Sequence, residues 1–395
     1  MLERETQILT TQTLPTGAPV STRLASIDLL RGTVMLLMLL DHVRERFLYH
    51  RQVADPMDLD VTDPGLFFTR MLAHLCAPVF VFLTGLSAWL YANPVKGQAR
   101  DASAFLFKRG LFLILLEATL VNLSWFGRYE TLYLQVIWAI GVSMLALAAL
   151  CRLPRPAVFG LGLLIVFGHN LLTPISFEPG QWGYTAWSIL HDRGTIFTSE
   201  ALTIRASYPV LPWIGVILLG FSAGPLFSAK VDSDTRIRLL VQLGLAALAM
   251  LLVLRGLNLY GETVPWQSQA SVIETVMDFF NYTKYPPSLD YLLLTLGIGF
   301  LLLALFERAR GSLALAVSTF GSAPMFFYLL HLYVLLLGYQ LAMAFIGPNY
   351  GELYAFDNLS QIWLVTVILA VVLYFPTVAF ARFKRRTSWG WVKYF

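Results

Sequence analysis

Residues 24–47 read LASIDLLRGTVMLLMLLDHVRERF, an apolar run of membrane-spanning length that is interrupted by charged and titratable side chains. Asp28 and Arg31 lie near its start, and Asp41 and His42 lie near its end. A charged group at membrane depth costs on the order of 3 kcal/mol on insertion scales, so such groups usually face a bundle interior or a wet cavity and mark a functional path. This stretch therefore predicts a helical membrane protein with a polar chamber.

The composition of the whole chain supports the same class. Of 395 residues, 57% are hydrophobic and 13% are charged, whereas soluble domains carry about 25% charged residues. The basic residues are scattered and form no single patch of the kind that binds nucleic acid. Only two cysteines are present, and no spacing of His, Cys and Glu indicates a metal site. We expect membrane lipid as a partner and expect neither nucleic acid nor a metal.

The fold class that we predict is an all-α integral membrane protein, a bundle of about ten transmembrane helices with both termini in the cytoplasm. Residues 1–22 are predicted to form a flexible cytoplasmic tail, and residues 23–395 a single transmembrane domain. The ninth span is long enough to be broken near Gly321 and Pro324. The predicted spans are 24–47, 66–91, 104–125, 132–151, 157–172, 208–227, 237–255, 289–306, 316–345 and 362–382.

Lysine and arginine set the orientation, because cytoplasmic loops of membrane proteins carry an excess of both. With the N-terminus inside, the inner segments hold about twice as many basic residues as the outer segments. The long connections, residues 47–65, 173–207 and 256–288, all fall outside. This asymmetry predicts a multi-pass membrane protein that works on something outside the cytoplasm.

Polar residues of the first span share one helix face. Asp28 and Arg31 are three residues apart and can pair. His42 follows Arg31 by eleven residues, which corresponds to about three turns and roughly 16 Å along the helix. Asp41 beside His42 can fix the tautomer of a general base. The structural alternatives are an ion pair that only fixes packing, for Asp28 and Arg31, and an interfacial pair for Asp41 and His42.

Two further histidines lie in apolar runs. His74 is expected at a depth similar to that of His42 on the adjacent antiparallel helix, which makes it a second candidate base. His331 lies in the middle of the ninth span and is either a binding residue or a structural hydrogen-bonding residue between helices. Lys284 and Tyr285 precede the eighth span. Lys284 is a candidate donor to an oxyanion, although a lysine there can also reach the outer interface for solvation alone.

Several blocks resemble the catalytic-domain family of heparan-α-glucosaminide N-acetyltransferase. They occur in order over nearly the whole chain. They are Arg23-Leu-x-Ser-Ile-Asp28-x-x-Arg31-Gly32, Asp41-His42-Val-Arg44, Phe67-Phe-Thr-Arg-x-x-x-His74-x-Cys-Ala-Pro78-Val-Phe-Val-Phe-Leu-x-Gly85, Tyr208-Pro-x-Leu-Pro-Trp-Ile-Gly-Val216, Lys284-Tyr-Pro-Pro-Ser-Leu289 and Pro324-x-Phe-Phe-Tyr-x-x-His331.

The resemblance implies a polytopic transmembrane acyltransferase that uses acetyl-CoA or another acyl-CoA. The lysosomal member of the family takes acetyl-CoA from the cytosol and acetylates a terminal glucosamine amine in the lumen. Its proposed catalytic histidine lies in the loop after the first span, where the nearest equivalent here is His50. The Asp41-His42 and His74 pattern looks like the bacterial branch of the family.

We therefore predict transfer of an acetyl group from cytoplasmic acyl-CoA to an amine or hydroxyl of an extracytoplasmic glycan or amino sugar. His42, His74 and Asp41 are the predicted catalytic residues. The predicted substrate-binding residues are Asp28, Arg31, Lys284, Tyr285 and His331. A multispan transporter for a small polar solute is the alternative from another class. The sequence leaves the oligomeric state open, a homodimer included.

Overall fold

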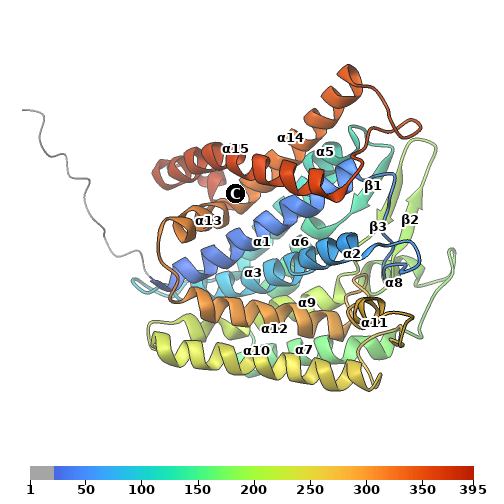
Figure 1. The fold of residues 1–395 in the computed structure, drawn as a ribbon. Coiled ribbons are helices and arrows are strands. Elements are labelled where there is room, and N and C mark those ends of the chain that lie inside the picture. The colour runs from blue at the N-terminus through green and yellow to red at the C-terminus, as the bar shows by residue number, and fades with distance from the viewer. Residues whose placement is uncertain (1–21) are drawn as a thin grey trace, which may run out of the picture.

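The structure, a computed structural model, describes residues 22–395, and helices form most of it (Figure 1). The predicted tail lies outside the described residues except for its last position. The helices are α1 (Thr22–Phe47), α2 (Pro64–Ala73), α3 (Cys76–Ala92), α4 (Ser103–Leu116), α5 (Asn122–Phe126), α6 (Val136–Leu150), α7 (Arg155–Gly168), α8 (Tyr184–Leu190), α9 (Leu211–Ala223), α10 (Ser233–Gly256), α11 (Val272–Phe279), α12 (Leu289–Phe306), α13 (Ser312–Ser322), α14 (Pro324–Phe345) and α15 (Leu359–Arg386).

Among the described residues, six helical segments are long and apolar enough to cross a membrane. They are Pro64–Ala92, Arg155–Leu172, Ser233–Gly256, Leu289–Phe306, Pro324–Phe345 and Leu359–Arg386. Three shorter apolar helices accompany them, and the 26-residue α1 carries the charges described above. A mainly helical membrane protein is thus confirmed, whereas the count of ten spans and the position of the termini remain predictions.

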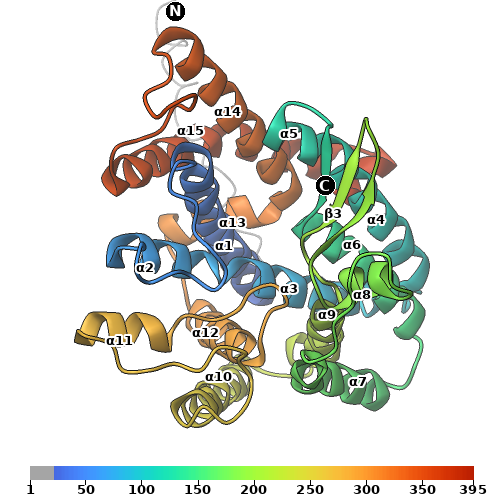
Figure 2. The same ribbon diagram turned by 90° about the vertical axis from the view of Figure 1, so that its right-hand side faces the viewer.

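One end of the bundle carries structure that the sequence analysis did not predict. Strands β1 (Thr131–Leu134), β2 (Gly194–Thr198) and β3 (Thr203–Ala206) form a small sheet in the order β1-β3-β2, with β1 parallel and β2 antiparallel to β3. Strands β2 and β3 and helices α8 and α11 belong to connections predicted to be outer, and β1 overlaps the outer end of the predicted span 132–151. All of them lie at the same end of the bundle (Figures 1 and 2). We call this the outer end.

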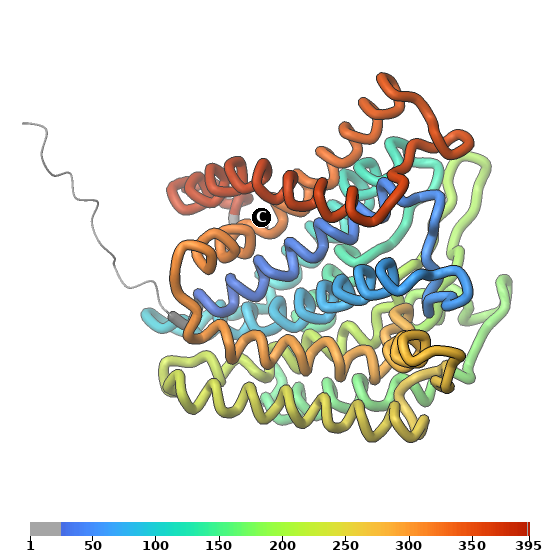
Figure 3. Tube along the Cα trace, viewed as in Figure 1, coloured from blue at the N-terminus to red at the C-terminus, as the bar shows by residue number. Residues whose placement is uncertain are grey.

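The first helix occupies the middle of the bundle. The chain trace shows α1 and the α2–α3 segment between the C-terminal helices α14 and α15 on one side and α10 and α12 on the other (Figure 3). This central position explains why α1 buries residues such as Val34 and Leu39 completely although it also carries charged side chains. Asp41 and Arg44 are buried and Arg31 lines an internal cavity, so these charges of α1 face the interior of the protein.

Glycines allow α1 and α3 to approach their neighbours backbone to backbone. A Cβ atom on Gly32 of α1 would lie 1.9 Å from the carbonyl oxygen of Val317 in α13. A Cβ atom on Gly85 of α3 would lie 2.0 Å from the carbonyl oxygen of Ile217 in α9. Small residues at helix crossings are typical of membrane bundles, in which van der Waals packing drives helix association.

The predicted break in the ninth span is present. Helix α13 ends at Ser322 and α14 begins at Pro324, with Ala323 between them in a non-helical conformation. Proline has no backbone N–H, and the N–H at the first helical position would have no partner within the helix, so Pro324 starts α14 without the loss of a hydrogen bond. Ser322, Pro324 and Met325 line the internal cavity described next, so the break opens this part of the bundle toward the cavity.

Candidate functional site: a chamber inside the bundle

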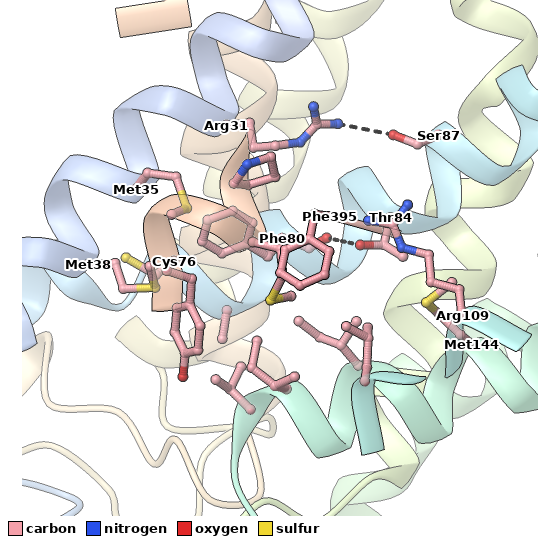
Figure 4. A pocket seen from close by; sticks show the side chains of 18 of the residues that line it. Arg31, Met35, Met38, Cys76, Phe80, Thr84, Ser87, Arg109, Met144 and Phe395 are labelled. Carbon is pink, nitrogen blue, oxygen red and sulfur yellow. Dashed lines mark hydrogen bonds between the residues drawn. The ribbon is translucent and has the colours of Figure 1, made fainter. Parts of the chain in front are cut away.

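A cavity of about 390 Å³ runs alongside α1. Arg31, Met35, Met38, Asp41 and His42 all contribute to its wall, so one face of α1 lines it from one end to the other. Arg31 and His42 of the predicted polar face thus line the cavity, whereas Asp28 is not part of its wall. Other wall residues come from α3, α4, α6, α14 and the C-terminal segment, and they include Cys76, Phe80, Thr84, Ser87, Arg109, Met144 and Phe395 (Figure 4).

The inner end of the chamber is cationic. Arg31 donates a hydrogen bond to Ser87 Oγ at 3.1 Å (Figure 4). It also donates to Asp28 Oδ1 at 2.8 Å and to the Gly321 carbonyl oxygen at 3.1 Å. Arg109 and Lys384 also line the chamber and lie close enough to Arg31 to interact with it electrostatically. Three cations therefore face one carboxylate here, an imbalance that suits an anionic ligand.

The outer end of the chamber holds a network of buried charges. Asp41 accepts hydrogen bonds from Arg44 Nε at 3.0 Å and Nη2 at 2.8 Å, and Arg70 Nη1 lies 3.8 Å from the same carboxylate oxygen, Oδ1. Nη1 of Arg70 also lies 3.8 Å from Oε1 of Glu45. Pairing of this kind offsets the cost of burying charge. No hydrogen bond joins Asp41 to His42 in the described part of the chain, so Asp41 contacts the arginines instead.

Lys284 reaches this network from the connection before α12. It is buried at 5% exposure and lines the chamber. Burial by itself lowers the pKa of the Lys284 amine, but Tyr285, Asp41 and Glu45 outweigh it and raise this pKa above its ordinary value. Lys284 therefore stays charged near neutral pH and can face a developing negative charge.

Asp55 holds the backbone on either side of the lysine side chain. Its carboxylate accepts hydrogen bonds from the backbone N–H groups of Lys284 at 3.2 Å and of Tyr285 at 3.1 Å. The side chain of Asn281 makes two more bonds between the same two outer segments, accepting from Met57 N at 2.8 Å and donating to Met57 O at 2.7 Å. The position of Lys284 thus depends on a loop that is more than 200 residues away in the sequence.

His42 makes its direct polar contact with His331. Nδ1 of His42 lies 2.7 Å from Nε2 of His331, and His331 Nδ1 lies 2.7 Å from the carbonyl oxygen of Phe327. His331 is fully buried at 0% exposure and is not part of the chamber wall, whereas His42 is one of the residues that line it. Trp125 and Tyr328 pack edge-on against the His42 ring at centroid distances of 5.0 and 5.9 Å. His42 is therefore held on three sides.

The other predicted site residues occupy different positions. His74 is buried at 2% exposure beside Tyr291, whose hydroxyl donates to the His74 carbonyl oxygen at 2.8 Å, and the His74 ring is not part of the chamber wall. The ring of His50 stacks on the ring of Tyr350 in the outer loops, with the ring centroids 3.9 Å apart, and His50 is also not part of the chamber wall. Tyr285 donates a 3.1 Å hydrogen bond to Tyr208 Oη, and Tyr208 lines the chamber. The structure brings His42 together with His331 and not with His74.

Sequence reasoning missed Lys384 and Tyr328 as chamber residues. Lys384 lies in a basic C-terminal stretch that is well explained by orientation in the membrane, so nothing in the sequence set it apart. Tyr328 is the tyrosine of the block Pro324-x-Phe-Phe-Tyr-x-x-His331, where nothing marked it as a residue of a chamber. Both reach the chamber through packing between distant helices, for which the sequence alone gives no signal.

These features define a multi-pass membrane protein with a charged internal chamber. Residues 23–260 match the family model described as heparan-alpha-glucosaminide N-acetyltransferase, catalytic. The match covers more than half of the chain, so the protein belongs to this family, which points to a membrane acetyltransferase. No match to an individual curated protein accompanies it.

Proposed function

We propose that this protein is a multi-pass acyltransferase of the bacterial inner membrane. It transfers an acetyl group from acyl-CoA, which enters from the cytoplasm, to an amine or hydroxyl of an extracytoplasmic glycan or amino sugar. The observation that carries the proposal is the continuity of one chamber, which has Arg31, Arg109 and Lys384 at one end and His42 and Lys284 at the other.

The inner end suits the anionic part of the donor. Arginine binds phosphate through a planar fork of donors, and lysine adds a point charge. The wall between the two ends is mostly apolar, with Met35, Met38 and Phe80 among its residues. Eleven residues separate Arg31 from His42, which corresponds to about 16 Å along a helix. A pantetheine arm extended along this wall would bring the thioester close to His42.

The outer end suits the chemistry. His42 takes the proton from the acceptor amine or hydroxyl, whose lone pair then forms the new bond to the thioester carbonyl carbon. The charged amine of Lys284 stabilises the oxyanion of the tetrahedral intermediate. Collapse of this intermediate breaks the C–S bond, and the CoA thiolate leaves with the proton from His42. Asp41 supports this arrangement by holding Arg44 and Arg70 and by favouring the charged form of Lys284.

The acceptor is proposed to reach the chamber between the outer loops. Tyr285 connects Tyr208 in the chamber wall to Arg193, whose guanidinium lies 4.9 Å from the Tyr285 ring centre. Aromatic rings and hydrogen-bonding groups of this kind can stack on and orient a sugar. His74, which lies near the buried charges of the outer end, remains the second candidate for the base.

Transfer of label from donor to acceptor tests the proposal. Purified protein is incubated with acetyl-labelled acetyl-CoA and a panel of amino sugars and neutral sugars, and a His42→Gln variant serves as the inactive control. The proposal predicts labelled sugar and free CoA in equal amounts with wild-type protein. Saturable sugar flux into proteoliposomes without consumption of acetyl-CoA would contradict the proposal and show that the protein is a transporter.

A further inference from the structure

The two histidines of the chamber region form a chain of hydrogen bonds that ends on a backbone carbonyl. The Phe327 carbonyl oxygen lies 2.7 Å from His331 Nδ1, and His331 Nε2 lies 2.7 Å from His42 Nδ1. The planes of the two imidazoles are inclined by only 19°. Each ring nitrogen in this chain has one partner, so the positions of the protons follow from the chemistry of the partners.

A carbonyl oxygen only accepts hydrogen bonds, so His331 Nδ1 must carry a proton. His331 is fully buried, and no carboxylate is bonded to it in residues 22–395. Burying an unpaired charge is costly, so the neutral imidazole is the favoured form. In neutral His331 the second nitrogen, Nε2, has a lone pair and accepts. His42 Nδ1 must then be the donor, which leaves the lone pair of His42 on Nε2.

From this chain of bonds we propose that His331 is a positioning residue that fixes the tautomer of His42, so that His42 Nε2 is the atom that removes the proton from the acceptor. The inference deepens the proposed function and rests on it for the role of His42 as base. It assigns to His331 an action on His42 in place of direct contact with substrate, which agrees with its position behind the chamber wall.

The arrangement replaces the carboxylate that usually orients a catalytic histidine by a neutral imidazole. Asp41 does not take this part, because its carboxylate accepts from Arg44 and makes no hydrogen bond with His42 in the described chain. When His42 Nε2 gains the acceptor's proton, its Nδ1–H still points at the lone pair of His331, so the positive charge is stabilised by this bond. The same proton then leaves from Nε2 to the CoA thiolate, and both rings return to their starting forms.

Two substitutions of His331 separate positioning from packing. His331→Phe keeps a flat ring but removes the acceptor, whereas His331→Gln keeps an acceptor oxygen in reach of His42 Nδ1. The expected loss in kcat for His331→Phe is on the order of 10²-fold or more, since a catalytic histidine held in the wrong tautomer can lose about 10⁴-fold. The KM for acetyl-CoA is expected to stay near the wild-type value, and His331→Gln should recover at least about ten-fold of the loss in kcat.

His169→Phe is the matched control, because His169 is also buried and lies outside the chamber wall. It should leave kcat unchanged. Equal losses of kcat in His331→Phe and His331→Gln would overturn the inference, since packing alone would then explain them. A loss that falls on the KM for acetyl-CoA and not on kcat would also overturn it.

A measurement that needs no turnover keeps the inference separate from the proposed function. ¹⁵N NMR of histidine-labelled protein distinguishes a ring protonated at Nδ1 from one protonated at Nε2, and His42→Gln identifies the His42 signals by their loss. The expected result is His42 protonated at Nδ1 in wild-type protein and a shift toward Nε2–H in His331→Phe. His42 protonated at Nε2 in wild-type protein would overturn the inference even if acyl transfer were observed. The expected tautomer without any acyl transfer would contradict only the proposed function.

Discussion

The guanidinium group of Arg31 donates a 3.1 Å hydrogen bond to the carbonyl oxygen of Gly321, which lies 290 residues further along the chain. The same group is bonded to Asp28 and Ser87, so Arg31 both joins three segments and offers charge to the chamber. Arg31→Lys should therefore lower the melting temperature, because a lysine cannot reproduce this fork of bonds. We also expect weaker binding of CoA by isothermal titration. A variant that loses only thermal stability would show that Arg31 is structural.

Arg109 allows a cleaner test of donor binding. It lines the chamber, and no hydrogen bond of its side chain occurs in the described chain. Arg109→Gln should raise the Kd for CoA by about 10-fold or more, since a hydrogen bond to a charged group contributes about 1.5–3 kcal/mol. The neighbouring Lys108 is exposed and outside the chamber wall. Lys108→Gln should leave the Kd nearly unchanged, and equal effects of both substitutions would count against a specific phosphate site.

His42 is the expected base, and its removal should affect rate more than folding. His42→Ala should reduce kcat on the order of 10²-fold or more while the protein still inserts and purifies, because general-base catalysis contributes on that scale. His74→Ala, measured in parallel, decides between the two candidates that the sequence suggested. The chamber geometry predicts the larger loss for His42. Near wild-type kcat in the His42 variant would remove it from the mechanism.

Much of this site could be predicted from the sequence, because charged residues in an apolar run are visible without a structure. The shared face of Arg31 and His42 follows from helix geometry alone, and the structure confirms that both line one cavity. The contact between His42 and His331 could not be predicted, because it joins residues 289 positions apart and depends on how α14 packs on α1. The three-stranded sheet was missed because its strands are short and because β1 overlaps the start of the apolar run predicted as the span 132–151.

Asp55 should give a pH-dependent contribution to stability. Burial raises the pKa of the Asp55 carboxyl above its ordinary value, although Arg70, Lys284 and Arg193 oppose this shift. Asp55 therefore binds a proton more readily in the folded protein than in the unfolded chain. At a pH above the raised pKa, the ionised Asp55 carboxylate lowers the stability of the fold. As the pH falls through the raised pKa toward the ordinary range of Asp, wild-type protein should gain stability relative to Asp55→Asn.

Melting temperatures of both proteins across this pH range measure the effect. The melting temperature of Asp55→Asn minus that of wild type should be highest near neutral pH. It should fall as the pH is lowered through the raised pKa of Asp55. A difference that does not change with pH would show that Asp55 has the same proton affinity in both states.

The close approach of α3 and α9 predicts a large cost for a single methyl group. Gly85→Ala should lower the melting temperature clearly, because its Cβ would lie 2.0 Å from the Ile217 carbonyl oxygen, and overpacking typically costs about 1–3 kcal/mol. Gly160 of α7 has nothing within 4 Å of the same position. Gly160→Ala should leave stability unchanged or raise it slightly, since glycine costs about 0.5–1 kcal/mol in a helix. Similar effects of the two would contradict the packing of α3 on α9.

Transfer of label across a sealed membrane tests the central claim most directly. Protein is reconstituted in proteoliposomes of known orientation, with acetyl-labelled acetyl-CoA on one side and an impermeant amino sugar on the other. We predict labelled sugar only when acetyl-CoA faces the end with Arg31, Arg109 and Lys384 and the sugar faces the end with Lys284. Transfer that required donor and acceptor on the same side would contradict a chamber that carries the acyl group across the membrane.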